Sequence, residues 1–257
     1  MTTRIRKPGE FCWTNMLTPQ PQAAREYFAQ VLGWTYGEIS GMGHVARAGG
    51  QDVGAIFDRD APMTPPGTPT QIGVMIKVAD ADAAIARVIE LGGKAKPPFP
   101  VGNGIRMAVC HDPNGAPFDI WESATAKGLE VDPLQHGAPS WFETITTDVP
   151  RAEAFYSALF GWSVQRMPMP GGQYTTFHLD GDPRGVAGMM SERLAGRESP
   201  PQWAVYFTVV DAAEAVRITQ TRGGSVGVAL REVTGVGTMA GLLSPQGVMF
   251  HVLQYPR

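Results

Sequence analysis

A stretch of 22 residues occurs twice in this chain, and this repeat constrains the fold more than any other feature. Residues 13–34 read WTNMLTPQPQAAREYFAQVLGW and residues 141–162 read WFETITTDVPRAEAFYSALFGW. The second copy begins and ends 128 positions after the first (141 − 13 = 162 − 34 = 128), so no residue is gained or lost between them. Each copy predicts a short strand, a turn and an amphipathic helix that ends at Gly-Trp. An internal repeat of this kind indicates a duplicated unit.

The two halves stay aligned beyond this stretch. Val78-Ala79-Asp80 matches Val209-Val210-Asp211 at an offset of 131, and Met107, Pro113, Gly115 and Phe118 match Met239, Pro245, Gly247 and Phe250 at 132. An ordered series with so little drift indicates that the whole half is duplicated. We expect one domain over residues 1–124, a linker over 125–139 and a second domain over 140–257.

Each half divides again into two similar modules. Helices are predicted over Pro21–Leu32, Ala81–Leu91, Pro150–Phe160 and Ala212–Arg222. Strands are predicted over Phe11–Thr18, His44–Ala48, Val53–Phe57, Ile72–Val78, Ile105–Cys110, Ala116–Glu122, Ser140–Thr146, Tyr174–Leu179, Val186–Met190, Trp203–Val209, Thr238–Leu243 and Val248–Gln254. Proline-rich loops over Asp60–Pro69 and Arg193–Pro201 would join the modules. The pattern predicts an α+β fold.

Composition excludes several classes of protein. The formal net charge of −3 offers no basic surface for nucleic acid, and no apolar run is long enough to span a membrane. The N-terminus lacks the apolar segment of a secretory signal. The two cysteines, Cys12 and Cys110, are expected to be buried reduced thiols of a cytoplasmic protein. No nucleotide-binding, zinc-protease or serine-hydrolase motif is present.

The motifs resemble those of one superfamily. They are W-x-E-x-x-T-x-D followed by A-x-x-F-Y-x-x-L-F-G-W, then Y-F-x-V-x-D-A, then [DS]-P-x-G-x-x-F. This series is similar to the vicinal oxygen chelate superfamily, which includes glyoxalase I, extradiol dioxygenases and fosfomycin- and bleomycin-resistance proteins. Within it the chain most resembles the two-domain actinobacterial glyoxalase-like or hydroxylase-like branch. The resemblance implies four βαβββ modules paired into two domains, each a half-open barrel around a cavity.

The resemblance also implies where a metal ion would be bound. Relatives carry a His or Gln ligand at the positions of Trp13 and Trp141, whose only polar atom is an N–H donor. The last-strand positions hold Asp119 and His251, which can ligate. The remaining ligand positions fall near Gly73, Ala204, Ala55 and Gly188, which cannot. We therefore expect no tightly bound metal and no other cofactor; a divalent metal is the weaker alternative.

Four polar residues are the candidate catalytic groups. Glu143 lies two residues after Trp141 and is expected on the same strand face, as is Asn15 after Trp13. Glu143 with His251, and Asn15 with Asp119, could carry out acid–base chemistry. In the alternative interpretation, Glu143 is hydrogen-bonded to a neighbouring strand or an indole N–H, and His251 is a packed strand histidine.

Aromatic residues are the candidate walls of the cavities. They are Trp13, Trp141, Trp203, Tyr206, Tyr174, Phe118 and Phe250. Such walls suit a planar or apolar ligand, although ordinary core packing is the alternative for several of them. Arg106 could bind an anionic substrate group or be a surface arginine, and His44 could face a cavity or solvent.

These features favour a glyoxalase-like enzyme that transfers a proton on a carbonyl, enol or aromatic metabolite without a tightly bound metal. The alternative is a binding protein of the bleomycin-resistance type that sequesters a planar natural product. The expected partner is a small molecule, with no nucleic acid and no membrane, and the chain is expected to be a monomer or a homodimer.

Overall fold

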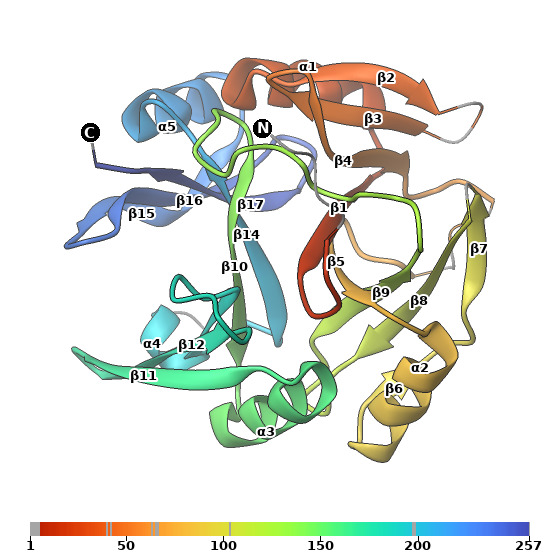
Figure 1. Ribbon diagram of the computed structural model, residues 1–257. Coiled ribbons are helices and arrows are strands. Elements are labelled where there is room, and N and C mark those ends of the chain that lie inside the picture. The colour runs from red at the N-terminus through yellow and green to blue at the C-terminus, as the bar shows by residue number, and fades with distance from the viewer. Residues whose placement is uncertain are drawn as a thin grey trace. The chain divides into compact units, whose positions relative to one another are not determined.

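A computed structural model describes residues 6–39, 41, 43–62, 64, 67–102, 104–196 and 199–256 (Figure 1). The fold is α+β, as predicted, with the strands assigned to a nine-stranded and an eight-stranded curled sheet. No helix in the described ranges is long and apolar enough to cross a membrane.

The described part of the first half contains nine strands and two helices. They are β1 (Phe11–Thr18), α1 (Pro21–Leu32), β2 (Thr35–Ile39), β3 (Gly43–Ala48), β4 (Gln51–Asp58), β5 (Gln71–Val78), α2 (Ala81–Glu90), β6 (Lys94–Ala95), β7 (Phe99–Gly102), β8 (Ile105–His111) and β9 (Pro117–Glu122). The second half contains β10 (Pro139–Thr146), α3 (Val149–Phe160), β11 (Ser163–Met169), β12 (Gly172–His178), β13 (Ala187–Ser191), α4 (Glu192–Ala195), β14 (Gln202–Thr208), α5 (Ala212–Thr221), β15 (Ser225–Val233), β16 (Gly237–Leu243) and β17 (Met249–Gln254).

The four βαβββ modules are confirmed, and the four predicted helices agree with α1, α2, α3 and α5 to within one residue at each end. The sequence missed β2, β6, β7, β11 and β15. All but β7 are the first strand after a helix, and β11 is exposed at nearly every position, so no buried face marks it in the sequence. The predicted loop Arg193–Pro201 was partly wrong, because its first residues belong to the short helix α4.

Three of the long helices begin at an aspartate. The carboxylate of Asp80 accepts a hydrogen bond from the Ala83 N–H, and Asp148 and Asp211 cap α3 and α5 in the same way. Helices α1 and α3 end at glycines in the left-handed conformation, Gly33 (φ 63°) and Gly161 (φ 70°). The repeated motif therefore encodes helix boundaries directly.

The chain forms two compact units, and each takes one module from each half. Unit 1 contains residues 1–13, 74–128 and 141–204, and unit 2 contains residues 14–73, 129–140 and 205–257. In unit 1 the strand orders are β5-β9-β8-β6, with β7 pairing β8, and β11-β12-β13-β10; in unit 2 they are β2-β3-β4-β1 and β14-β17-β16-β15. The predicted domain boundaries at 124 and 140 stay predictions.

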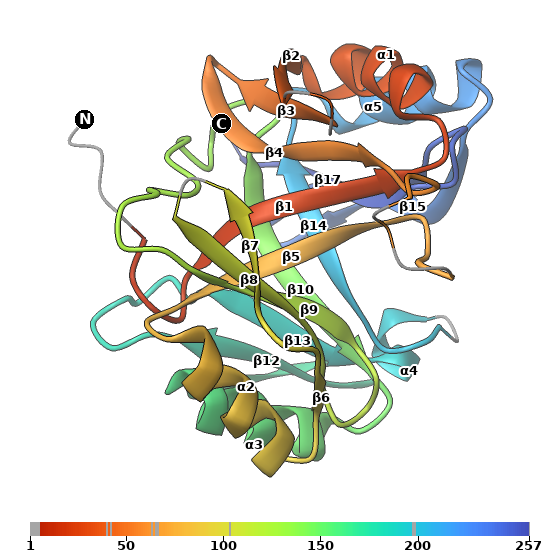
Figure 2. The same ribbon diagram turned by 90° about the vertical axis from the view of Figure 1, so that its right-hand side faces the viewer.

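The core of unit 1 lies where helices α2 and α3 come side by side (Figure 2). Phe118 of β9 packs edge-on against Phe155, Tyr156 and Phe160 of α3. The Tyr156 hydroxyl is fully buried; it donates to the Asp112 carboxylate (3.1 Å) and accepts from the Trp203 N–H (2.9 Å). Burial of these aromatic side chains stabilises the unit.

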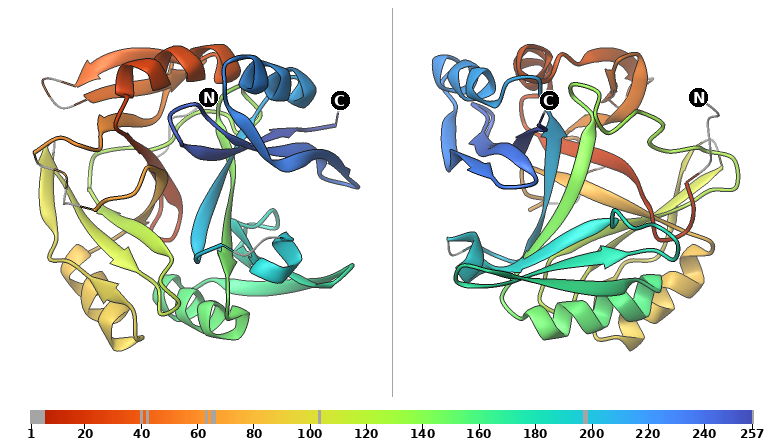
Figure 3. Two further views of the ribbon diagram at one scale, coloured as in Figure 1. Left: turned by 180° about the vertical axis from the view of Figure 1, so that it is seen from behind. Right: turned by 60° about the vertical axis from the view of Figure 1, so that its left-hand side comes forward.

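The core of unit 2 is built in the same way around α1 and α5, which also lie side by side (Figure 3). Phe28 packs against Trp34 and Phe250, and the Tyr27 hydroxyl is 2.7 Å from that of Thr219. The helix aromatics thus pack against the sheets. Both cysteines are buried free thiols, as predicted.

Candidate functional site

A chain of three side chains connects Trp141 to Glu143 in unit 1. The Trp141 indole N–H donates to the Tyr174 hydroxyl (2.9 Å), and that hydroxyl donates to Glu143 Oε2 (2.7 Å). Glu143 is only 4% exposed. The phenol O–H donates to one carboxylate oxygen, so this chain of hydrogen bonds holds the buried Glu143 carboxylate in a fixed orientation.

Strand geometry explains how these residues meet. Trp141 and Glu143 are two residues apart on β10 and share a face, as predicted. Glu143 pairs with Gly188 of β13, which pairs with Thr176 of β12, so Tyr174 two residues earlier reaches over the same face. We call this surface of β10, β12 and β13 the Glu143 face.

Gly188 makes room for the chain. A Cβ at this position would overlap the Tyr174 hydroxyl and lie 2.9 Å from Trp141 Nε1. Its backbone conformation is ordinary, so the glycine is required for space and not for a positive φ. The sequence identified Gly188 only as a position that cannot ligate a metal.

His178 extends the same face. Its Nε2 is 2.8 Å from the Thr176 hydroxyl and its Nδ1 is 3.2 Å from the Asp182 carbonyl oxygen. The ring is buried and held on both sides. We therefore regard it as a fixed part of the Glu143 face, beside Thr176.

A second face of unit 1 lies on β5, β8 and β9 and has a different character. Trp121 packs edge-on against Trp13, with ring centroids 5.6 Å apart, in a cluster with Cys12, Met75 and Met107. We call the surface that carries Met75, Lys77, Met107, Asp119 and Trp121 the Trp121 face, since their strand pairings place them on one side. Aromatic rings and methionines make an adaptable apolar wall.

Asp119 is the carboxylate of the Trp121 face. It pairs with Met75 and Val109 and is partly accessible. Burial of the carboxyl group raises the pKa of Asp119 to about 7, which is the range in which a carboxyl group can both donate and accept a proton at neutral pH.

Unit 2 holds the other two candidate catalytic residues. His251 is 2% exposed and its ring stacks on Tyr206 of the neighbouring strand, with centroids 4.6 Å apart. Asn15 pairs with Ala55 of β4. The pairings of Glu143 with His251 and of Asp119 with Asn15 join different units and stay predictions.

Three predicted wall residues turn out to belong to helix–sheet cores. Phe118 and Phe250 are buried against α3 and α1, and Trp203 is buried against Tyr156 and Phe11. They lie on the opposite strand faces from Asp119, His251 and Tyr206, because side chains alternate along a strand. For them the structure favours the alternative of core packing, and contact with a ligand stays a prediction.

Two further candidate site residues, Arg106 and His44, lie on the opposite strand faces from Trp121 and Asn15. Arg106 forms ion pairs with Asp82 (2.8 Å) and Glu122 (3.2 Å), and it pairs along the strand with Glu122, on the opposite side from Trp121. His44 pairs with Ile56, whereas Asn15 pairs with Ala55, so His44 and Asn15 lie on opposite sides of that sheet.

The residues at the family's ligand positions do not fit a tightly held metal ion. Trp141 offers only an N–H, and it gives that hydrogen bond to Tyr174. Across the described ranges, no three or more His, Cys, Asp or Glu side chains are grouped so that they could hold a metal ion.

Comparison with known proteins identifies the family. Residues 13–121 match the family model "Glyoxalase-like domain", and residues 140–178 match "Bleomycin resistance protein-like N-terminal". The chain is 32% identical over 252 residues, covering 94% of this chain and 93% of the relative, to "Putative glyoxylase CFP32" of Mycobacterium tuberculosis. It is 31% identical over 263 residues to "Anthracycline biosynthesis protein DnrV" of Streptomyces peucetius, covering 96% and 94% of the two chains.

Solved structures agree on the fold. The Mn(II)-bound glyoxalase from Novosphingobium aromaticivorans superposes with a TM-score of 0.67 at 16% identity, over 96% of this chain and 82% of that one. The catechol dioxygenase BphC superposes with a TM-score of 0.63 at 11% identity, over 96% and 87%. The chain belongs to the vicinal oxygen chelate superfamily, in its glyoxalase-like branch. The resemblance inferred from the motifs is confirmed.

Proposed function

We propose that this chain is a metal-independent enzyme that moves a proton on a small carbonyl or enol compound, with the Glu143 carboxylate as the base. The observation that carries the proposal is the chain Trp141–Tyr174–Glu143. A buried carboxylate costs free energy unless it is hydrogen-bonded, and here a phenol supplies that bond on one oxygen. The carboxylate is thereby held in a fixed orientation, from which it can accept a proton.

The chemical step needs no further reactant. A Glu143 oxygen takes a proton from the carbon next to a carbonyl group, and the C–H electron pair moves into the carbon framework while the carbonyl π pair moves to oxygen to give an enolate. The protonated carboxyl group then returns the proton to another atom, and the product is an isomer. Positioned acid–base catalysis of this kind typically contributes about 10²–10⁴-fold in rate.

Tyr174 and Trp141 act as positioning residues. The indole N–H fixes the Tyr174 oxygen, so that its proton points to Glu143. Gly188 keeps the space for this hydroxyl open.

The names of relatives favour a carbonyl-bearing substrate. One is called a glyoxylase and another an anthracycline biosynthesis protein. The Trp121 face, with Trp13 and two methionines, would suit the planar part of an aromatic compound. That same face supports the second candidate function, in which the chain binds such a compound without changing it.

One experiment separates the two functions. The protein is screened by melting temperature against polycyclic aromatic ketones, anthracyclines and the thiohemiacetal of methylglyoxal, and each compound that stabilises it is incubated in D₂O and analysed by mass spectrometry. Enzyme function predicts deuterium at carbon or a new isomer. Glu143→Gln should still be stabilised by the compound but lose this product at least about 100-fold.

Glu153→Gln is the matched control, because Glu153 is a carboxylate of the same unit that pairs with Arg166 on the surface. It should behave as the unaltered protein. Stabilisation without any product for every compound would favour the binding function instead.

A further inference from the structure

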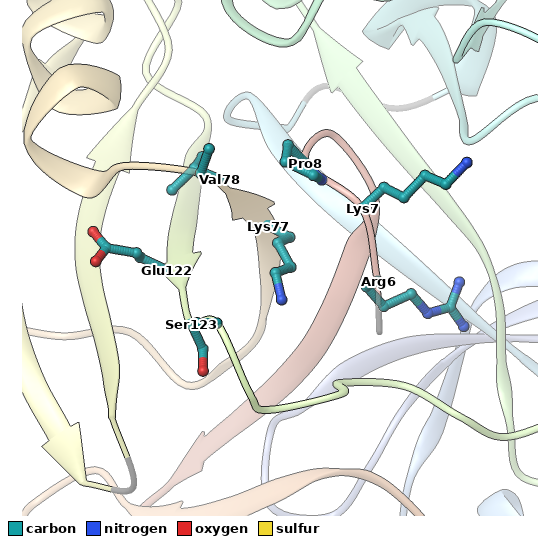
Figure 4. Close-up of a pocket in the computed structure, with 9 residues that line it drawn as sticks. Arg6, Lys7, Pro8, Lys77, Val78, Glu122 and Ser123 are labelled. Atoms are coloured by element: carbon teal, nitrogen blue, oxygen red, sulfur yellow. The ribbon is translucent and has the colours of Figure 1, made fainter. Parts of the chain in front are cut away.

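A buried lysine lines a pocket that the proposed reaction does not use. The pocket lies in unit 1, has a volume of about 420 Å³, and is lined by Arg6, Lys7, Pro8, Lys77, Val78, Ala79, Glu122, Ser123 and Ala124 (Figure 4). It is formed where the N-terminal segment passes the ends of β5 and β9. Figure 4 shows the Lys77 ammonium reaching into the space beside Ser123.

Lys77 is poorly satisfied by the protein. It is 6% exposed, yet among the described residues the one hydrogen-bond acceptor recorded for its Nζ is the Ala126 carbonyl oxygen, at a long 3.4 Å. An ammonium group has three N–H donors, and a buried charge without a counter-ion is costly. The position therefore favours a group that brings negative charge.

The charges of the lining residues also favour an anionic ligand. Arg6 and Lys7 also line the pocket, with their charged ends directed away from Lys77 (Figure 4), and Glu122 is its one carboxylate among the described residues. Glu122 is already engaged, because its Oε2 accepts hydrogen bonds from the Ala81 N–H (2.7 Å) and from Arg106 (3.2 Å). The lining is therefore positive overall.

Ser123 can supply a further donor. Its Oγ accepts hydrogen bonds from the N–H groups of Thr125 (3.3 Å) and Ala126 (3.0 Å), which fixes the turn after β9. Its own hydroxyl proton can point into the pocket that it lines.

The second half shows that the fold does not require a cation here. Lys77 and Thr208 occupy equivalent positions, each one residue before the matched valines Val78 and Val209. The Thr208 hydroxyl donates to the Pro133 carbonyl oxygen at 2.5 Å, so a neutral side chain satisfies the same position. The lysine is a departure from the duplicated pattern.

We propose that this pocket binds an oxyanion, namely the phosphate or carboxylate group of a small molecule, with Lys77 as its principal contact and Ser123 at its rim. Since Lys77 shares a strand face with Trp121, the anion would lie at the edge of the Trp121 face. An aromatic compound carrying an acidic group could then contact both. The site does not depend on proton transfer at Glu143.

The test is titration calorimetry with inorganic phosphate and, separately, acetate, against sodium chloride at the same ionic strength. Phosphate or acetate should bind the unaltered protein with a heat that chloride does not give. Lys77→Thr, which copies the second half, should weaken binding at least about 10-fold, a loss of about 1.4 kcal/mol.

Two controls make the result decisive. Lys94→Thr removes an exposed lysine of β6 in the same unit and should bind as the unaltered protein does. Glu143→Gln should also bind normally, so that failure of the proton-transfer proposal is distinguishable from failure of this one. Melting curves establish that Lys77→Thr is folded; we expect its melting temperature in chloride to be at least that of the unaltered protein, because a poorly paired buried charge has been removed.

Preference between the two anions identifies the group that the natural ligand carries. Tighter binding of phosphate indicates a phosphate, and equal or tighter binding of acetate indicates a carboxylate. The proposal is overturned if neither anion gives a heat of binding beyond that of chloride. It is also overturned if folded Lys77→Thr binds as tightly as the unaltered protein.

Discussion

Trp13 and Trp141 occupy the same position of the duplicated stretch and have different neighbours. Trp141 donates its N–H to Tyr174 and so orders the Glu143 carboxylate. Trp13 packs edge-on against Trp121 in an apolar cluster. One copy is part of a polar chain, and the other is part of an aromatic wall.

The residues around the two tryptophans also differ between the copies. By strand pairing, Glu143, Gly188 and Tyr174 of the second half correspond to Asn15, Ala55 and Gly43 of the first. Where Tyr174 places a hydroxyl, the first half has no side chain, and where the second half needs a glycine, the first has an alanine. The duplicated scaffold was kept while the side chains on this face were exchanged as a set.

The substitution Gly188→Ala should reveal the difference between the two copies most strongly. The added methyl group would overlap the Tyr174 hydroxyl, and forcing an extra carbon into a packed site costs about 1–3 kcal/mol. We expect a lower urea midpoint and loss of any product formed through Glu143. The matched change in the first half, Ala55→Gly, should cost about 1–2 kcal/mol, since it adds backbone freedom and removes one buried methyl group but introduces no clash. Equal effects at the two positions would show that the glycine has no special role.

Asp119→Asn should alter the pH dependence of stability. The pKa of Asp119 is raised to about 7 in the folded state and is about 3.9 in an unfolded chain, so the folded protein binds the extra proton. The contribution of Asp119 to the free energy of unfolding is therefore fully present below pH 4 and is lost as the pH rises from 4 to 7. Because the carboxyl is partly accessible, we expect a difference of about 2 kcal/mol between pH 5 and pH 8, relative to the Asn variant.

Urea unfolding of both proteins at the two pH values measures this difference directly. The unaltered protein should lose more stability on going to pH 8 than Asp119→Asn does. Parallel pH profiles would mean that the carboxyl group is better solvated than the structure indicates.

Tyr174→Phe should have a smaller effect on stability. It removes the hydroxyl that joins Trp141 to Glu143, and leaving buried polar groups with one partner fewer costs about 1–2 kcal/mol. Turnover of a substrate should fall while its binding is retained, because the carboxylate loses its orienting donor. Tyr36→Phe, which removes a hydroxyl bonded to the Arg25 carbonyl oxygen, is the control and should leave turnover unchanged.

Much of the fold could be predicted from the sequence because its signals are local. The repeat, the aspartate caps and the helix-ending glycines are signals that each involve residues close together in the sequence. The predicted helices agree with the structure to within one residue at each end. Strand alternation likewise placed Trp141 and Glu143 on one face. The edge strand β11 was missed because its exposed residues carry no such alternation.

The site was less predictable because it depends on partners far apart in sequence. Tyr174 was expected as a wall residue, and its bond to Glu143, 31 residues away, follows only from the register of β10, β12 and β13. Trp203 and Phe250 were placed in cavities because aromatic character does not reveal which face of a strand a residue occupies. Lys77 could have been noticed from the sequence. It is the cation of strand β5, and its equivalent in the second half is a threonine.

The most direct test of the central claim is the rate of solvent deuterium exchange into a compound that stabilises the protein, measured after dialysis against EDTA. We predict that the dialysed protein keeps its rate within about twofold and that Glu143→Gln loses at least about 100-fold. Loss of exchange on dialysis with recovery on adding a divalent metal ion, or an unchanged rate in folded Glu143→Gln, would contradict the account.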